Sequence, residues 1–203
     1  MKLYTSSKAP NPRRVHVFLA EKGVDVPRIE VDIMKKEHKE PDFIARNPMM
    51  GLPVLELDDG THIAESIAIC RYFEELRPDP QLFGVDLVDR ALVEMWQRRM
   101  ELYLMGPVAH AFRHSHPAMA ELETPQVAEW AEANKPRIFR MLEWLDGELE
   151  NRPYIAGERY TVADITALVA VDFMRPVRLS VPESCANVLR WHAEVSARPS
   201  AKA

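Results

Sequence analysis

Cysteine is scarce in this sequence. Only Cys70 and Cys185 occur among its 203 residues, and they lie far apart along the chain. Two isolated cysteines provide neither a disulfide framework, nor a CxxC redox motif, nor a zinc-type set of ligands. If the protein performs thiol chemistry, the thiol must therefore come from another molecule.

Long apolar runs and an excess of positive charge are also absent. No stretch reaches the roughly 18 to 20 apolar residues that a membrane span requires, and the opening residues, MKLYTSSKAP, have no apolar signal-peptide core. The formal net charge of -5, from 26 basic and 31 acidic side chains, gives no basic footprint for a nucleic acid. We therefore expect a cytoplasmic protein that binds neither a membrane nor a nucleic acid.

The first part of the chain alternates between strand and helix patterns. KLYTS predicts a short strand, and NPRRVHVFLAEKG predicts a helix with Asn11 as its N-cap, Pro12 in its first turn and Gly23 at its end. In PRIEVDI, apolar and charged residues alternate with the period of a half-buried strand.

A hairpin and a helix complete this region. PVLEL, the turn residues Asp58, Asp59 and Gly60, and THIA together predict a β-hairpin with a type I′ turn. SIAICRYFEEL then predicts a helix. Residues 1–77 are therefore expected to form a small α/β domain.

The remainder of the chain has helix-like patterns only. RPDPQLFG contains two prolines and a glycine and predicts a linker over residues 78–84. Apolar residues then recur at helical spacing, with Pro136 as an expected break in a long pattern. We expect an α/β plus all-α architecture, with an all-helical domain over residues 85–203.

Five segments in this order resemble a bacterial cytosolic glutathione S-transferase: NPRRVHVFLAEKG, NPMMGLPVL, the pair ES after the hairpin, YIAGERYTVADI and WHAEVSARPSAKA. The resemblance covers essentially the whole chain. It implies a thioredoxin-like N-terminal domain that binds glutathione, a helical C-terminal domain that contributes the electrophile pocket, and a homodimer. Glutathione would be a cosubstrate, and no metal or other cofactor is implied.

Pro53 precedes the strand pattern at 54–57, although proline cannot donate a hydrogen bond to a sheet. In a thioredoxin-like fold the proline at this place is cis, and the next residue turns its backbone N–H and C=O towards a peptide-like ligand. The resemblance therefore implies that Pro53 is cis and that Val54 hydrogen-bonds the cysteinyl unit of glutathione. Alternatively, Pro53 simply begins an edge strand.

Glu65 and Ser66 stand where the third predicted helix begins. The γ-glutamyl end of glutathione carries an ammonium and a carboxylate. Ser66, as the cap of a helix N-terminus, would offer a hydroxyl and free amides to the carboxylate, and Glu65 would pair with the ammonium. Alternatively, Ser66 only caps the helix and Glu65 is solvated.

His38 and Lys39 match the position from which related transferases bind the glycine carboxylate of glutathione. A carboxylate needs a cation or a strong donor, which both residue types supply. Alternatively, the segment KKEHKE is a solvated loop of mixed charge.

Three residues are candidates for activating the glutathione thiol: Asn11, Ser6 and Ser7. A hydroxyl or amide donor beside a helix N-terminus stabilises a thiolate. Tyr4 lies too early for the tyrosine-using transferases, and Ala9 stands where others carry a hydroxyl. Asn11 resembles the asparagine that approaches the sulfur in some bacterial transferases, although as a helix cap it would have a purely structural role.

Two further motifs are open to a functional or a structural interpretation. His110, His114 and His116 are compatible with metal ligation or with the rim of the electrophile pocket, but no carboxylate or cysteine completes a recognisable metal set. Thr161 and Asp164 have capping-box spacing. Asp164 is therefore expected to be buried and hydrogen-bonded, without contact to substrate.

The sequence therefore predicts a glutathione S-transferase that conjugates the glutathione thiolate to small apolar electrophiles. Two alternatives remain at this point. The protein could reduce disulfides with glutathione, which needs no cysteine of its own, or it could be a non-catalytic relative that binds glutathione or another ligand.

Overall fold

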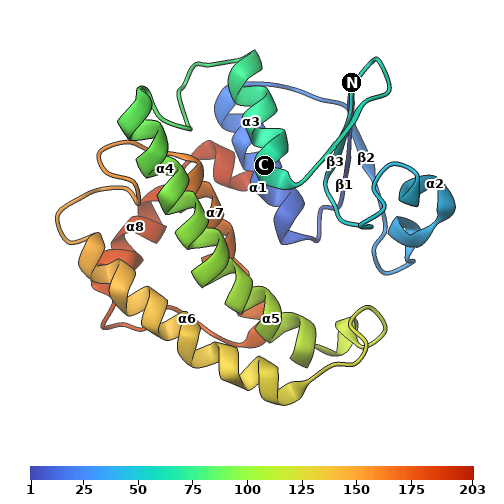
Figure 1. Cartoon of the computed structure of the whole chain (residues 1–203). Helices are drawn as coiled ribbons and strands as arrows, with labels where there is room; N and C mark the ends of the chain where they lie inside the picture. The colour runs from blue at the N-terminus through green and yellow to red at the C-terminus, as the bar shows by residue number, and fades with distance from the viewer. The chain divides into compact units, whose positions relative to one another are not determined.

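The computed structural model describes residues 1–203, and the chain divides into two compact units (Figure 1). The first unit contains Met1–Gln81 together with Lys202–Ala203, and the second contains Leu82–Ala201. The division between them falls inside the segment 78–84, where a linker is expected from the sequence. None of the helices combines the length and the apolar composition needed to cross a lipid bilayer.

The first unit is built on a four-stranded mixed sheet with the strand order β2-β1-β3-β4 (Figure 1). Strand β1 pairs in parallel with β2, and β3 pairs antiparallel to both β1 and β4. Helices α1 and α3 pack against each other. The elements are β1 (Lys2–Thr5), α1 (Pro10–Lys22), β2 (Arg28–Glu30), the 3₁₀ helix η1 (Glu37–Lys39), α2 (Pro41–Ile44), β3 (Val54–Glu56), β4 (His62–Ala64) and α3 (Ser66–Leu76).

Each face of the sheet has its own buried residues because successive side chains of a strand point to opposite sides. Leu3 and Leu55 lie opposite each other in the β1–β3 register, and both are fully buried. Tyr4 and Val54 form the next pair, on the other face, and pack with Phe43 of α2 and other apolar side chains. Both faces are therefore covered, as expected for a thioredoxin-like domain.

The predicted N-cap of the first helix is wrong. Helix α1 begins at Pro10, its N-cap is Ala9 in extended backbone, and no side chain caps it. Pro10 and Pro12 have no N–H group, so little in this first turn requires a side-chain acceptor. Asn11 is instead the second residue of the helix. The predicted end at Gly23 is confirmed, because Gly23 has a φ of 60° in the left-handed region.

The predicted hairpin is confirmed, but its turn is not of type I′. Type I′ requires positive φ at both central residues, and Gly60, with a φ of 84°, is the one residue of this loop with positive φ. The Leu57 N–H donates to the Thr61 carbonyl at 2.9 Å, and the Gly60 N–H donates to the Leu57 carbonyl at 3.1 Å. The loop therefore has three residues, ending on glycine, rather than two.

The second unit is helical throughout. Its helices are α4 (Leu87–Arg99), the π-helix η2 (Met100–Met105), α5 (Gly106–Ser115), α6 (Ala128–Glu148), α7 (Val162–Asp172) and α8 (Ala186–Ser196), with the short 3₁₀ helices η3 (Pro117–Met119), η4 (Arg175–Val177) and η5 (Pro199–Lys202). The predicted break at Pro136 is wrong, because α6 continues through it. The contact of α6 with α5 outweighs the one hydrogen bond that a proline removes.

Asp164 organises the start of α7. It is fully buried and forms a capping box with Thr161. Its carboxylate accepts hydrogen bonds from the Thr161 N–H and hydroxyl, from the Ile155 N–H and from the Trp191 indole, at 2.9 to 3.1 Å. Burial raises the pKa of Asp164 to about 6, against the effect of these donors. The expectation of a buried, hydrogen-bonded aspartate is confirmed.

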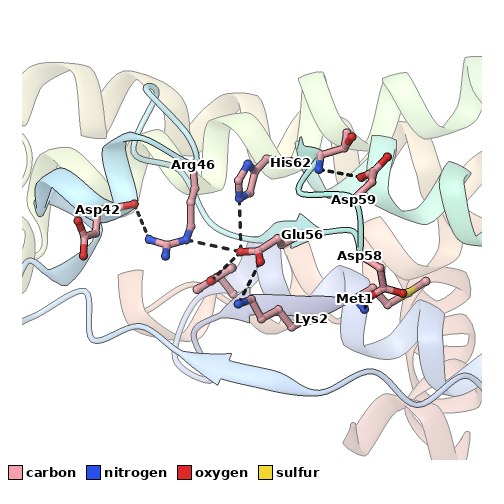
Figure 2. Close-up of polar contacts among 10 residues, drawn as sticks. Met1, Lys2, Asp42, Arg46, Glu56, Asp58, Asp59 and His62 are labelled. Atoms are coloured by element: carbon pink, nitrogen blue, oxygen red, sulfur yellow. Dashed lines mark hydrogen bonds and ion pairs between the residues drawn. The ribbon is translucent and has the colours of Figure 1, made fainter.

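Glu56 is the centre of a polar network on the sheet (Figure 2). Its carboxylate accepts from the Tyr4 hydroxyl at 2.8 Å and pairs with Lys2 at 3.0 Å. The His62 and Arg46 side chains lie 3.4 and 3.7 Å from the same carboxylate. The hydrogen bonds from Lys2 and then Tyr4 lower the pKa of Glu56 to about 2. The network therefore links β1, β3, β4 and the segment after α2.

Replacing Glu56 with glutamine should lower the melting temperature at neutral pH. The pKa of Glu56 is depressed in the folded state, from an ordinary value of about 4.5 to about 2. Its contribution to stability is therefore present above about pH 4.5 and is lost as the pH falls towards 2. Melting curves of the wild type and Glu56→Gln should converge over this range. The matched control is Glu75→Gln, an exposed glutamate of α3, and a pH-independent gap for Glu56→Gln would contradict the assignment.

Candidate active site

Strand register brings most of the predicted residues to one end of the sheet. Val54, the first residue of β3, lies opposite Tyr4 of β1 and Ala64 of β4. Because β1 and β4 both run towards this end, the chain continues from them into Ser6 and Glu65 respectively. The β1–α1 loop and the starts of β3 and α3 therefore meet.

Pro53 and Val54 lie at the centre of this end. The Leu52–Pro53 peptide bond is cis, as predicted. The alternative that Pro53 begins an edge strand is wrong, because β3 lies between β1 and β4. Val54 is fully buried.

Helix α3 has a different N-cap from the one that the sequence predicts. Glu65 is the N-cap of α3 and Ser66 is the first helical residue, so the prediction of Ser66 as the cap is wrong. Glu65 has a φ of 68° and a ψ of 118°, which is strained for a residue with a side chain. Its own side chain makes no capping hydrogen bond and is exposed. The first amides of α3 have no partner within the helix, as at any helix start.

His38 and Lys39 lie on the 3₁₀ helix η1 and differ in burial. The His38 side chain is buried, and its Nδ1 has no hydrogen-bond partner. Burial, followed by the charge of Lys39, lowers the pKa of His38, so its imidazole is neutral at pH 7. Lys39 is exposed. The alternative of a solvated loop therefore fits Lys39 but not His38.

The three candidates for thiol activation are in different environments. Ser7 is exposed, and both its N–H and its hydroxyl donate to Glu30, at 2.9 and 3.0 Å. Ser6 is buried directly after β1. Asn11 is exposed near the start of α1, and its Oδ1 accepts from the Arg14 guanidinium at 2.8 Å. The amide NH₂ of Asn11 is therefore the part that remains available as a donor.

His16 is a neighbour of this site that the sequence analysis missed. Its Nε2 lies 2.7 Å from the Thr5 hydroxyl, and both side chains are buried. Burial, and then the charge of Arg28, lowers the pKa of His16 to about 4, so the imidazole is neutral. The pair fixes the end of β1 just before Ser6. In the sequence, the one indication of this role was that His16 lies on the apolar face of the first predicted helix.

The remaining side chains considered for thiol chemistry are either hydrogen-bonded to another residue or buried. The Tyr4 hydroxyl donates to Glu56 at 2.8 Å. Cys70 is fully buried, and burial raises the pKa of its thiol. Burial also raises the pKa of Cys185. Neither cysteine lies among the predicted site residues.

The three histidines of α5 and its end contact their own surroundings. Nδ1 of His114 accepts from the Val127 N–H, and Nδ1 of His116 accepts from the Ala118 N–H, both at 3.2 Å. The His110 ring lies 5.8 Å from that of Trp130. No group of three or more His, Cys, Asp or Glu side chains is placed to hold a metal ion.

Comparisons with known proteins agree with this geometry. Residues 9–76 match the family model of the glutathione S-transferase N-terminal domain, and residues 99–199 match that of the C-terminal domain. Glutathione S-transferase 2 of Saccharomyces cerevisiae is 37% identical over all of this chain and 88% of its own length. The chain belongs to the glutathione S-transferase family. The family and the fold predicted from the sequence are both confirmed, and the protein is an enzyme of this family.

Solved structures of this family superpose closely on the chain. The crystal structure of a glutathione S-transferase domain-containing protein from Marinobacter aquaeolei has a TM-score of 0.95 and 39% identity, covering 98% of this chain and 99% of that one. Gtt2 from Saccharomyces cerevisiae has a TM-score of 0.95 and 37% identity, covering 100% and 99%. A Gtt2-class transferase of Vibrio parahaemolyticus has a TM-score of 0.87 and 36% identity, covering 98% and 94%.

Proposed function

We propose that this glutathione S-transferase acts in the cytoplasm and conjugates the glutathione thiolate to small apolar electrophiles. The observation that carries the proposal is the meeting of the β1–α1 loop, the start of β3 and the start of α3 at one end of the sheet. Each of these segments offers the chemistry that one part of the tripeptide needs.

The γ-glutamyl end fits the start of α3. The Glu65 carboxylate pairs with the ammonium, and the Ser66 hydroxyl and the first amides of α3 bind the carboxylate at the positive end of the helix dipole. Helix α3 has 11 residues, long enough for this dipole to act. The strained backbone of Glu65 supports the assignment, because strain of about 1 to 3 kcal/mol persists mainly at functional positions.

The cysteinyl and glycine units of glutathione extend away from the start of α3. The backbone of Val54 pairs with the cysteinyl unit as an added strand does, which gives affinity without a side chain. The glycine carboxylate lies beside His38 and Lys39. A neutral imidazole with its proton on Nδ1 donates to that carboxylate, which would satisfy the buried, unpartnered Nδ1 of His38.

The thiolate is stabilised by Asn11, Ser6 and the start of α1. The amide NH₂ of Asn11 donates to the sulfur, since its oxygen is held by Arg14. Ser6 supplies a hydroxyl, and the N-terminus of α1 supplies a positive potential. Ser7 is a weaker candidate than Asn11 and Ser6, because its hydroxyl already donates to Glu30.

The test of the overall function is turnover with two substrates. In the presence of glutathione, a transferase of this kind should convert a halo-nitroarene, and absorbance measures the conversion. Faster turnover of hydroxyethyl disulfide than of any halo-nitroarene would favour the disulfide reductase, and binding of glutathione without turnover of either would favour the non-catalytic relative.

Glu65→Ala should weaken glutathione binding by about 1.5 to 3 kcal/mol, the contribution of a charge-assisted hydrogen bond to the ammonium. Isothermal titration calorimetry measures the loss. Glu75→Ala, at the other end of α3, is the matched control and should bind as the wild type does. Glu65→Gly should also bind weakly but be at least as stable as the wild type, because glycine accepts positive φ without strain. Wild-type affinity in both Glu65 variants would reject the assignment.

Asn11→Asp should lower turnover at neutral pH and regain it as the pH rises. The aspartate beside Arg14 is ionised, and its charge raises the pKa of the bound thiol by about one unit or more. Less thiolate therefore forms at pH 7, and more forms above the raised pKa. The melting temperature should not fall, because an acidic residue suits the first turn of a helix.

The control for this variant is Asn11→Ala, which removes the donor without adding a charge. Its pH profile should be displaced less than that of Asn11→Asp. A wild-type profile in both variants would leave Asn11 without a catalytic role and transfer that role to Ser6 and the amides of α1.

The enzyme should form a homodimer, as the family resemblance implies. Helix α4 exposes apolar side chains that a second copy would cover, with Leu87 86% and Val88 67% exposed. Light scattering at micromolar concentration should give twice the 23.3 kDa mass of the chain. Val88→Glu should reduce that mass, and a wild-type protein of monomeric mass would contradict the dimer.

A further inference from the structure

The side-chain amide of Asn11 has two ends with opposite effects on a thiolate. Its Oδ1 only accepts hydrogen bonds, and its NH₂ group only donates them. A thiolate is an acceptor, so the NH₂ end stabilises it and the oxygen end repels it. Asn11 is exposed, and an exposed amide on its own can present either end. The effect of Asn11 on a sulfur therefore depends on what fixes the orientation of its amide.

Arg14 fixes that orientation. Its Nη2 donates to Oδ1 of Asn11 at 2.8 Å, as side chains three residues apart on a helix can. A guanidinium has no acceptor, so it can bind only the oxygen end of the amide. Arg14 is 4% exposed and is therefore the restrained member of the pair. The NH₂ end of Asn11 is the end that Arg14 leaves available.

The start of α1 offers few other donors to a sulfur. The first four N–H positions of a helix, counted from the N-cap, have no partner within it. Here Pro10 and Pro12 have no N–H, and the Ala9 N–H donates to the Ser6 carbonyl at 3.3 Å. Asn11 holds the remaining N–H of this set. Its orientation therefore matters more here than at a helix start with several amides.

The guanidinium of Arg14 is buried where α1 packs against α3. Its charge lowers the pKa of the fully buried Cys70 thiol of α3, although burial raises that pKa far more. A cation loses favourable hydration in such a place, and an apolar side chain of similar length would serve packing alone. A role through Asn11 therefore accounts for a charged residue at this position.

We propose that Arg14 is a positioning residue for activation of the glutathione thiol. It holds Oδ1 of Asn11 so that the NH₂ end meets the sulfur. As a charged donor it also polarises the amide, which makes the NH₂ group a stronger donor. Arg14 acts through Asn11 and does not touch the sulfur. The proposal rests on the proposed role of Asn11.

The test is the pKa of glutathione bound to the enzyme, measured from the ultraviolet absorbance of its thiolate over a pH titration. Arg14→Met keeps the length of the side chain but removes the donor and the charge. It should raise that pKa by about one unit. Its calorimetric affinity for S-methylglutathione, which has no ionisable thiol, should equal that of the wild type. Loss of affinity for S-methylglutathione would indicate a merely structural role and overturn the proposal.

Two further variants separate position from charge and guard against a failure to fold. Arg13→Met, the matched control, removes the same charge from the neighbouring half-buried position and should leave the thiol pKa unchanged. Arg14→Lys keeps the buried charge but loses the planar fork of the guanidinium, so it should raise the pKa less than Arg14→Met does. Equal shifts in Arg13→Met and Arg14→Met would overturn the proposal, because charge alone would then be responsible.

A double variant tests whether Arg14 acts through Asn11. Asn11→Ala should raise the thiol pKa, and Asn11→Ala/Arg14→Met should raise it no further. Additive shifts would overturn the proposal, since Arg14 would then act on the sulfur independently. A wild-type pKa in Asn11→Ala would overturn the proposed role of Asn11 together with this one. A raised pKa in Asn11→Ala with a wild-type pKa in every folded Arg14 variant would overturn the positioning role alone.

Discussion

The antiparallel pairing of β3 between β1 and β4 is the constraint on which the candidate site depends. Its register sets Val54 opposite both Tyr4 and Ala64, and so brings Ser6 and Glu65 to the same end of the sheet. Side chains alternate with a period of two, so a slip of one residue would move Leu55 to the opposite face of the sheet and carry Val54 out of the candidate site. The buried pairs and the Glu56 network both oppose such a slip. The core and the binding edge therefore rest on the same hydrogen bonds.

Local sequence patterns predicted the elements well and their ends less well. Apolar periodicity was sufficient for α1, α3, the hairpin and the helical unit, because burial of one face fixes each of them. Apart from the break expected at Pro136, the errors concern helix caps and a turn, where a polar residue has more than one possible role. Asparagine is a common N-cap residue, but the helix begins at Pro10, one residue before Asn11. The loop after Leu57 contains a sequence typical of a two-residue turn, yet the strand register requires three residues.

Side-chain partners at the site were beyond prediction because they join segments that are distant in sequence. Ser7 and Glu30 are 23 residues apart, and their hydrogen bond, which occupies the Ser7 hydroxyl, exists only once β2 pairs with β1. The contact between Thr5 and His16 likewise depends on how α1 folds back onto the sheet. Resemblance to the family supplied the cis Pro53 and the positions of Glu65 and Ser66. It contained no information on which hydroxyl or amide remains free to approach a sulfur.

In the proposed site, ligand binding and folding stability place opposite demands on Glu65. Its backbone has a positive φ, which glycine adopts without strain, so the fold alone would favour glycine there. Glycine, however, has no carboxylate to offer an ammonium at the entrance to α3. Because Ala64 ends β4 and Ser66 begins α3, no neighbouring residue can place a side chain at the same point without changing the register of the strand or the start of the helix. If Glu65 binds the ammonium as proposed, its strain follows from the need for a charge at the junction between two elements that the core has already fixed.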